Sequence, residues 1–240
     1  MSSVLGSVEW GKHALDIIKH TKELDPSLPA IMHIRHSERF PVNLQQEGTT
    51  LALTSRGEKT AYEFGTKLPA NRQYFLHYTH VNRTQQTAEN IQKGIHHNNG
   101  TSYIGGIIPA TTMVDREAYN TIMANTIFSY DTELEGTRTY IHRWLSGFYP
   151  PSVMKPSIEH AKDLAAYMMM NLKDAGSSDF HIYVSHDMWV ASLFLHWLGE
   201  VSFDFVQYMD GFILQFYEEY VMAYFRGTKM KLEYPYWWSF

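Results

Sequence analysis

Residues 31–41 carry the sequence Ile31-Met32-His33-Ile34-Arg35-His36-Ser37-Glu38-Arg39-Phe40-Pro41. The stretch begins as a short apolar run, typical of a buried strand, and the run stops at Arg35. His36 then lies between two arginines. A neutral imidazole can be a nucleophile near neutral pH because its ordinary pKa is about 6.5, and the planar fork of arginine matches phosphate oxygens. The stretch therefore predicts a strand end that supports phosphoryl transfer.

Two further strand-to-helix junctions carry polar residues of the same kind. An aromatic strand candidate at residues 74–79 is followed by Arg83, and an apolar one at 180–184 is followed by His186 and Asp187. In open α/β sheets, ligands bind beyond the carboxyl ends of the strands, where helix N-termini favour anions. If the three strands are parallel, we expect their carboxyl ends to bring these side chains together at one edge of the sheet.

The remaining pattern predicts the fold class. Strand candidates alternate with amphipathic helices, and residues 212–225 resemble an antiparallel hairpin. This alternation predicts a three-layer α/β/α sandwich with a mostly parallel central sheet. Residues 95–156 are less regular and predict a small inserted cap. We expect one domain over residues 1–240, with an N-terminal helix at about 8–25.

Composition limits the partners that the chain can have. The 240 residues have a net charge of −5 and include no cysteine. This charge gives no general attraction to nucleic acid or to an anionic membrane, so neither is an expected partner. No histidine pair has the helical spacing of a zinc site, so we expect no metal and no other cofactor. Neither a signal peptide nor a membrane-spanning run is visible, which predicts a cytoplasmic protein; the oligomeric state is left open.

The polar residues differ in their chemical suitability. A phosphoryl group carries negative charge that three arginines and a protonated His186 could offset without a metal. His36 would attack in line and form a phosphohistidine, which water later cleaves. Asp187 is the nearest candidate acid for the leaving alkoxide. It must be protonated for that step, which burial or the arriving anion would favour.

These residues also carry a family resemblance. The segment Arg35-His36-Ser37-Glu38-Arg39-Phe40-Pro41 resembles the Arg-His-Gly-x-Arg-x-Pro signature of the histidine phosphatase superfamily, specifically its histidine acid phosphatase branch. Later landmarks of that family have counterparts in the same order, over roughly residues 30–94 and 157–199. They are Leu53-Thr54 with Gly57, Arg83-Thr84 followed by Thr87-Ala88, and His186-Asp187.

The resemblance implies a three-layer α/β fold and metal-independent hydrolysis of small-molecule phosphomonoesters through phosphohistidine. By matched position, it implies that His36 is the nucleophile and Asp187 the proton donor. The phosphate pocket would then consist of Arg35, Arg39, Arg83 and His186.

Two features depart from that pattern. Ser37 replaces the usual glycine and puts a Cβ at a position that could require a positive φ. The chain length is closer to the phosphoglycerate mutase-like branch, which takes its proton donor from a glutamate in the cap. Glu117 is therefore a second candidate for the donor.

Two other functions fit the same residues. A phosphomutase would transfer the phosphoryl group from His36 to a second substrate, and the choice between transfer and hydrolysis depends on what the cap admits. A non-catalytic protein could keep the pocket only to bind a phospho-ligand. The complete set of nucleophile, arginines and acid argues against a binding protein, because binding needs no nucleophile. The sequence therefore favours a phosphatase but does not specify its natural substrate.

Overall fold

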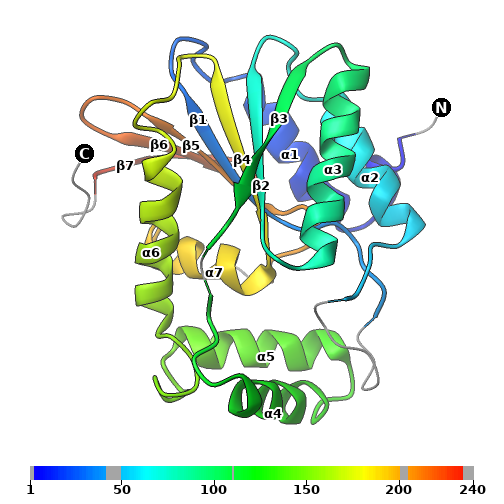
Figure 1. Ribbon diagram of the computed structural model, residues 1–240, viewed down its shortest axis with the longest axis vertical. Helices are drawn as coiled ribbons and strands as arrows, with labels where there is room; N and C mark the ends of the chain where they lie inside the picture. The colour runs from blue at the N-terminus through cyan, green and yellow to red at the C-terminus, as the bar shows by residue number, and fades with distance from the viewer. Residues whose placement is uncertain (1–2, 42–49, 110, 201–204, 235–240) are drawn as a thin grey trace.

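The computed structural model describes residues 3–41, 50–109, 111–200 and 205–234. Within these residues the chain forms a seven-stranded sheet with helices on both faces (Figure 1). The predicted three-layer α/β/α fold is confirmed. No helix in the described ranges has the length and hydrophobicity needed to cross a bilayer.

Four strands of the sheet are parallel, and the other three extend it in antiparallel fashion. The spatial order is β3-β2-β4-β1-β5-β6-β7. The parallel strands are β1 (Ala30–Arg35), β2 (Gln73–Tyr78), β3 (Thr101–Ile107) and β4 (Asp179–Ser185). The antiparallel strands are β5 (Gly211–Phe216), β6 (Val221–Phe225) and β7 (Thr228–Leu232).

The central strands are apolar because both of their faces are covered. All six residues of β1 are buried, as expected for a parallel strand between two helical layers. Alternate side chains of β1 enter different cores, because successive residues of a strand point to opposite faces of the sheet. Ile31 belongs to the core on one face of the sheet and Met32 to the core on the other. The predicted hairpin is confirmed as β5 and β6. The third strand of this unit, β7, has a charged and mostly exposed sequence, which is why the sequence did not indicate it.

One helical layer consists of α1 (Gly11–Thr21), which follows a short 3-10 turn at Leu5–Ser7, together with α2 (Ser55–Thr66) and α3 (Asn82–His97). The helical pattern from about Thr84 to Lys93 predicts a helix that stops at Gly94, and this was wrong, because α3 continues to His97. Gly94 instead faces Gly65 of α2, where a Cβ would lie 2.1 Å from the Tyr62 carbonyl oxygen. The glycine therefore permits close contact of two helices and does not end one.

The other layer consists of α6 (Ser157–Met170) and α7 (Asp187–His196). Two more helices, α4 (Arg116–Ile127) and α5 (Glu133–Leu145), pack together beyond the end of the sheet (Figure 1). The strand β3 lies within the range 95–156 that was expected for the cap, but it pairs in parallel with β2. Residues 101–107 thus belong to the sheet, and only the segment after them lies beyond it.

Candidate active site

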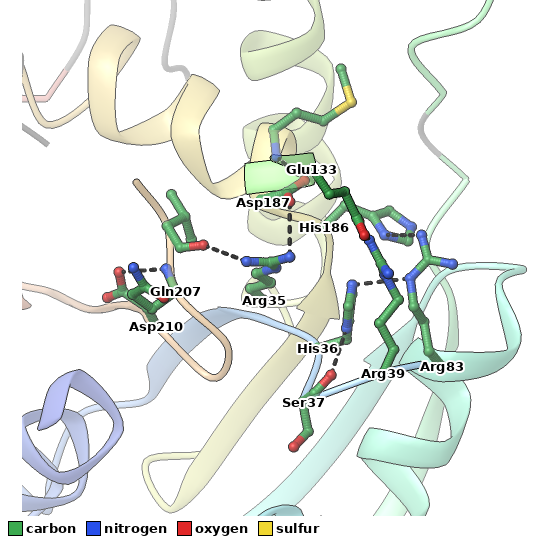
Figure 2. Close-up of polar contacts among 12 residues, drawn as sticks. Arg35, His36, Ser37, Arg39, Arg83, Glu133, His186, Asp187, Gln207 and Asp210 are labelled. Carbon is green, nitrogen blue, oxygen red and sulfur yellow. Dashed lines mark hydrogen bonds and ion pairs between the residues drawn. The ribbon is translucent and has the colours of Figure 1, made fainter. Parts of the chain in front are cut away.

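The strand ends of β1, β2 and β4 meet at one edge of the sheet. Arg35 is level with Ser185, and Tyr78 is level with Val184, because all three strands run parallel in matched register. The residues that follow the strands therefore converge, as the sequence predicted. Figure 2 shows His36, Arg83 and His186 directed toward one another from three different segments.

Hydrogen bonds fix the tautomer of His36. Its Nδ1 is 2.7 Å from the carbonyl oxygen of Ser37, which can only accept, so Nδ1 carries the proton. Nε2 is then the atom with the lone pair, and it accepts a hydrogen bond from Nε of Arg83 at 3.0 Å. Burial, followed by the charges of Arg83 and Arg35, holds the pKa of His36 well below its ordinary value. The site thus holds an unprotonated imidazole nitrogen next to guanidinium groups.

The contacts of His186 are also those of a neutral ring. Its Nδ1 lies 3.3 Å from Nη2 of Arg83, and its Nε2 lies 3.1 Å from the hydroxyl of Thr79. Because guanidinium only donates, Nδ1 is the acceptor and Nε2 carries the proton. Burial lowers the pKa of His186 well below its ordinary value, and the charges of Arg83, Arg35 and Arg39 lower it further. A protonated His186 would need a bound anion to offset these charges.

Arg35 is held on several sides by the segment that precedes β5. Its guanidinium lies over the ring of Tyr208, 4.3 Å from the centroid, and Nη1 donates to the carbonyl oxygen of Val206 at 2.8 Å. Its backbone N–H donates to the carbonyl of Asp210, whose buried carboxylate pairs with Arg226 at 2.7 Å. These contacts restrict the guanidinium to one orientation. Sequence reasoning missed this support, because the residues at positions 206–210 form no motif.

Asp187 and Glu133 each pair with one arginine of the site. Oδ2 of Asp187 is 3.1 Å from Nη2 of Arg35, and its Oδ1 accepts the backbone N–H of Met188. Glu133, the first residue of α5, places Oε1 at 2.6 Å from Nη2 of Arg39. The sequence indicated Asp187 but not Glu133.

Among the described residues, the glutamate in contact with Arg39 is Glu133 and not Glu117, the second candidate for the proton donor. Glu117 lies in the first turn of α4 with an exposed side chain. Within the described part of the chain, no hydrogen bond or ion pair joins it to the residues at the strand ends. The sequence signal near Glu133 is a helix start, in which the hydroxyl of Thr132 accepts the backbone N–H of Glu135 and donates to the carboxylate of Glu135. That signal predicts a helix terminus but not its contact with Arg39.

Arg83 is the arginine that contacts both imidazoles of the site. Burial, together with the charge of Arg39, lowers its pKa to about 10, so it stays charged at neutral pH. It interacts with both imidazoles, and Arg35 and Arg39 each contact a carboxylate. The charges of Arg83 and Arg35 act on His36, and those of all three arginines act on His186.

Ser37 is accommodated without strain. The residues with positive φ outside glycine are Asn99, Met209 and Arg226 among those described, and Ser37 is not one of them. Its side chain is buried and donates to the carbonyl of Gly57 at 2.8 Å, while its N–H donates to Thr87 Oγ1 at 3.0 Å. The hydroxyl therefore anchors the loop after β1 to α2, and the Cβ blocks nothing.

Comparison with known proteins bears on the fold. No protein-family model and no curated protein matches the sequence. Phosphoglycerate mutase from Bacillus anthracis str. Sterne matches the structure with a TM-score of 0.51 and 11% identity, over 87% of this chain and 94% of that one. Bacillus stearothermophilus YhfR matches with a TM-score of 0.54 and 15% identity, over 83% of this chain and 96% of that one. The protein has the phosphoglycerate mutase-like fold.

The α/β fold that the sequence resemblance implied is thus confirmed. In this phosphoglycerate mutase-like fold the site residues come from the ends of β1, β2 and β4, and α5 adds Glu133. The dipeptide His186-Asp187, one of the later landmarks of the resemblance, lies at the start of α7, where Asp187 contacts Arg35.

Proposed function

We propose that this protein is a metal-independent phosphatase that hydrolyses small-molecule phosphomonoesters through a phosphohistidine on His36. The observation that supports this most directly is the tautomer of His36. Its Nδ1 proton is held by the Ser37 carbonyl, so the lone pair of Nε2 is directed toward the arginines. A binding site for phosphate would need the arginines but would not need an oriented nucleophile among them.

The first step forms the N–P bond and breaks the ester P–O bond. A phosphate dianion attracts the N–H groups of Arg83. The hydrogen bond from Nε of Arg83 to Nε2 of His36 then breaks, and the lone pair of Nε2 becomes available. The guanidinium groups hold the phosphoryl oxygens, and His186 donates from a ring nitrogen once the anion favours its protonation. Nε2 attacks phosphorus, and the leaving alkoxide takes a proton from Asp187.

The second step regenerates the enzyme. Water attacks phosphorus, the carboxylate of Asp187 takes a proton from that water, and the N–P bond breaks to release phosphate. For Asp187 to begin protonated, its ion pair with Arg35 must weaken, and the substrate competes for the same guanidinium. Glu133 is the alternative donor, because it is a second carboxylate among the described residues that contacts an arginine of the site.

The segment that holds α4 and α5 is the proposed cap of this single-domain protein. Its α5 carries Glu133 to Arg39, and its Tyr119 hydroxyl lies 3.9 Å from the sulfur of Met188, next to Asp187. The cap therefore contributes to the side of the site from which the alcohol part of the substrate would leave.

The test is turnover of p-nitrophenyl phosphate in excess EDTA by the wild-type protein and by His36→Ala. We expect the variant to lose activity by a factor of about a thousand or more while it still binds vanadate. Acid-labile phosphate trapped on the wild-type protein should be absent from the variant. Near-normal turnover by His36→Ala would contradict the proposal, and transfer of phosphate to an added alcohol in preference to water would indicate a phosphomutase.

A further inference from the structure

Two buried threonine hydroxyls form a chain of hydrogen bonds that ends at His186. Thr79 directly follows β2, and Thr84 lies in the first turn of α3. Oγ1 of Thr79 is 3.1 Å from Nε2 of His186 and 2.9 Å from Oγ1 of Thr84. The direction in which each hydroxyl donates decides what the imidazole can do.

The hydroxyl of Thr84 has a fixed direction. Its Oγ1 is 2.7 Å from the carbonyl oxygen of Val81 and 3.1 Å from that of Thr79. Carbonyl oxygens only accept, so the hydroxyl proton of Thr84 points toward them. The lone pairs of Thr84 Oγ1 then accept the backbone N–H of Thr79 at 3.2 Å and the hydroxyl of Thr79 at 2.9 Å. Thr79 is therefore the donor in its contact with Thr84.

The direction of the Thr79 hydroxyl follows from that of Thr84. Because its proton goes to Thr84, only its two lone pairs are left for other partners. One accepts the backbone N–H of Val81 at 3.3 Å, and the other faces Nε2 of His186. An oxygen with no further proton to give can only accept from the imidazole. The two hydroxyls thus require a proton on Nε2 of His186, independently of the contact with Arg83.

The same contact directs the other ring nitrogen toward the anion site. Nδ1 of His186 lies 3.3 Å from Nη2 of Arg83, and Figure 2 shows the ring beside that guanidinium. In an imidazolium both nitrogens donate, so a hydroxyl that accepts at Nε2 suits the neutral ring and the protonated ring alike. His186 can therefore gain a proton on Nδ1 and donate it to an anion without turning its ring.

We propose that Thr79, with its direction set by Thr84, is a positioning residue for phosphoryl transfer. It holds His186 with Nε2 protonated, so that Nδ1 is the nitrogen that donates to the phosphoryl group. The two imidazoles of the site then have opposite tautomers, because His36 carries its proton on Nδ1. This inference rests on the proposed function and adds which nitrogen of His186 acts and what holds it in place.

Nitrogen NMR of histidine-labelled protein tests the tautomer without turnover, with signals assigned by His186→Ala. Near neutral pH we expect a protonated Nε2 and a bare Nδ1 in the free protein. Both nitrogens should carry protons once vanadate is bound. A free protein with the proton on Nδ1 would overturn the inference, and so would a vanadate complex in which Nδ1 stays bare. The measurement uses the wild-type chain, so it decides even where a variant does not fold.

Thr79→Val removes the hydroxyl and keeps the shape of the side chain, which leaves Nε2–H of His186 buried without its acceptor. We expect the affinity for vanadate and kcat/KM for p-nitrophenyl phosphate to fall about 10- to 100-fold, as the loss of a buried hydrogen-bond partner implies. Thr79→Ser should restore both to within about threefold of wild type. Thr21→Val is the matched control, because Thr21 is a buried threonine of α1 that donates to the carbonyl oxygen of Ile18. The control should leave the affinity for vanadate unchanged.

Full activity in Thr79→Val would overturn the inference, as would equal losses in Thr79→Val and Thr79→Ser. Turnover by the wild-type protein tests the proposed function separately. A protein that shows the expected tautomers, and a vanadate affinity that depends on the Thr79 hydroxyl, but hydrolyses no phosphomonoester would contradict the hydrolysis and retain the role of Thr79.

Discussion

Nε of Arg83 donates a hydrogen bond to Nε2 of His36 at a distance of 3.0 Å. The same guanidinium reaches Nδ1 of His186 at 3.3 Å, so one side chain orients both imidazoles of the site. The bond to His36 covers the lone pair that would attack phosphorus. A phosphate dianion that draws Arg83 toward its own oxygens would therefore bind substrate and release the nucleophile in the same movement.

Arg83→Lys should be strongly impaired although it keeps the positive charge. A single ammonium cannot donate in a plane to His36, His186 and a phosphate oxygen together. We expect kcat/KM for p-nitrophenyl phosphate to fall about 10- to 1000-fold. The control is Arg56→Lys, since Arg56 is exposed and pairs with Glu38. Similar activity in both variants would place Arg83 outside the reaction.

Asp187→Asn should separate substrates by their leaving groups. An alkyl alkoxide needs a proton as the ester bond breaks, whereas p-nitrophenolate needs very little. We expect a loss of about 100-fold or more for an alkyl phosphate and less than about tenfold for p-nitrophenyl phosphate. Equal losses on both would move the acid to Glu133, and Glu133→Gln would then show the selective loss.

The ring of His36 should remain neutral in mildly acid solution. Its pKa is held well below the ordinary value, so the unprotonated form persists as the pH falls through 6.5 and is lost only at lower pH. Nitrogen NMR of histidine-labelled protein, assigned with His36→Ala, should show a protonated Nδ1 and a bare Nε2 at pH 6. Protonation of both nitrogens at that pH would contradict the geometry described above.

The fold should lose stability in acid because four buried histidines resist protonation. Burial lowers the pKa values of His33 and His77 to about 3, and those of His160 and His181 to about 4. Since these values lie below the unfolded value of about 6.5, the unfolded chain binds more protons, and stability falls as the pH drops from about 6.5 toward 4. Each group should cost about 1.4 kcal/mol per pH unit within that window.

Denaturant titrations at pH 7.5, 6.0 and 5.0 test this dependence. His160 lies edge-on between Trp144 and Trp189, so His160→Phe keeps an aromatic ring there and removes one titrating group. The slope of the free energy of unfolding against pH should become shallower by about 1.4 kcal/mol per pH unit in that variant. A wild-type stability that is constant over this range would contradict the buried neutral state.

Local pattern was sufficient to predict β1, β2, β4 and the hairpin of β5 and β6, together with the polar residues that follow β1, β2 and β4. The apolar runs that became β1 and β4 stop where Arg35 and Ser185 meet in register, so the convergence of His36, Arg83 and His186 followed from parallel strands alone. The helix break expected at Gly94 was wrong, because a glycine can serve close packing as well as a helix end. The strand β7 was not predicted, because its residues are charged and mostly exposed and therefore lack the apolar pattern of a buried strand.

The sequence by itself determined the layers of the fold, the central parallel strands and the identity of the groups at their ends. The reason is that the apolar periodicity of strands and helices is visible within short stretches of sequence. Only the tertiary structure decided which partners those groups have. Arg39 and Glu133 are 94 residues apart, and their contact depends on how α5 packs beyond the sheet. The neutral state of His186 likewise follows from its burial and from the charges of Arg83, Arg35 and Arg39, which two separate segments bring close to it. Charge and proton affinity depend on distance in space, which local sequence does not specify.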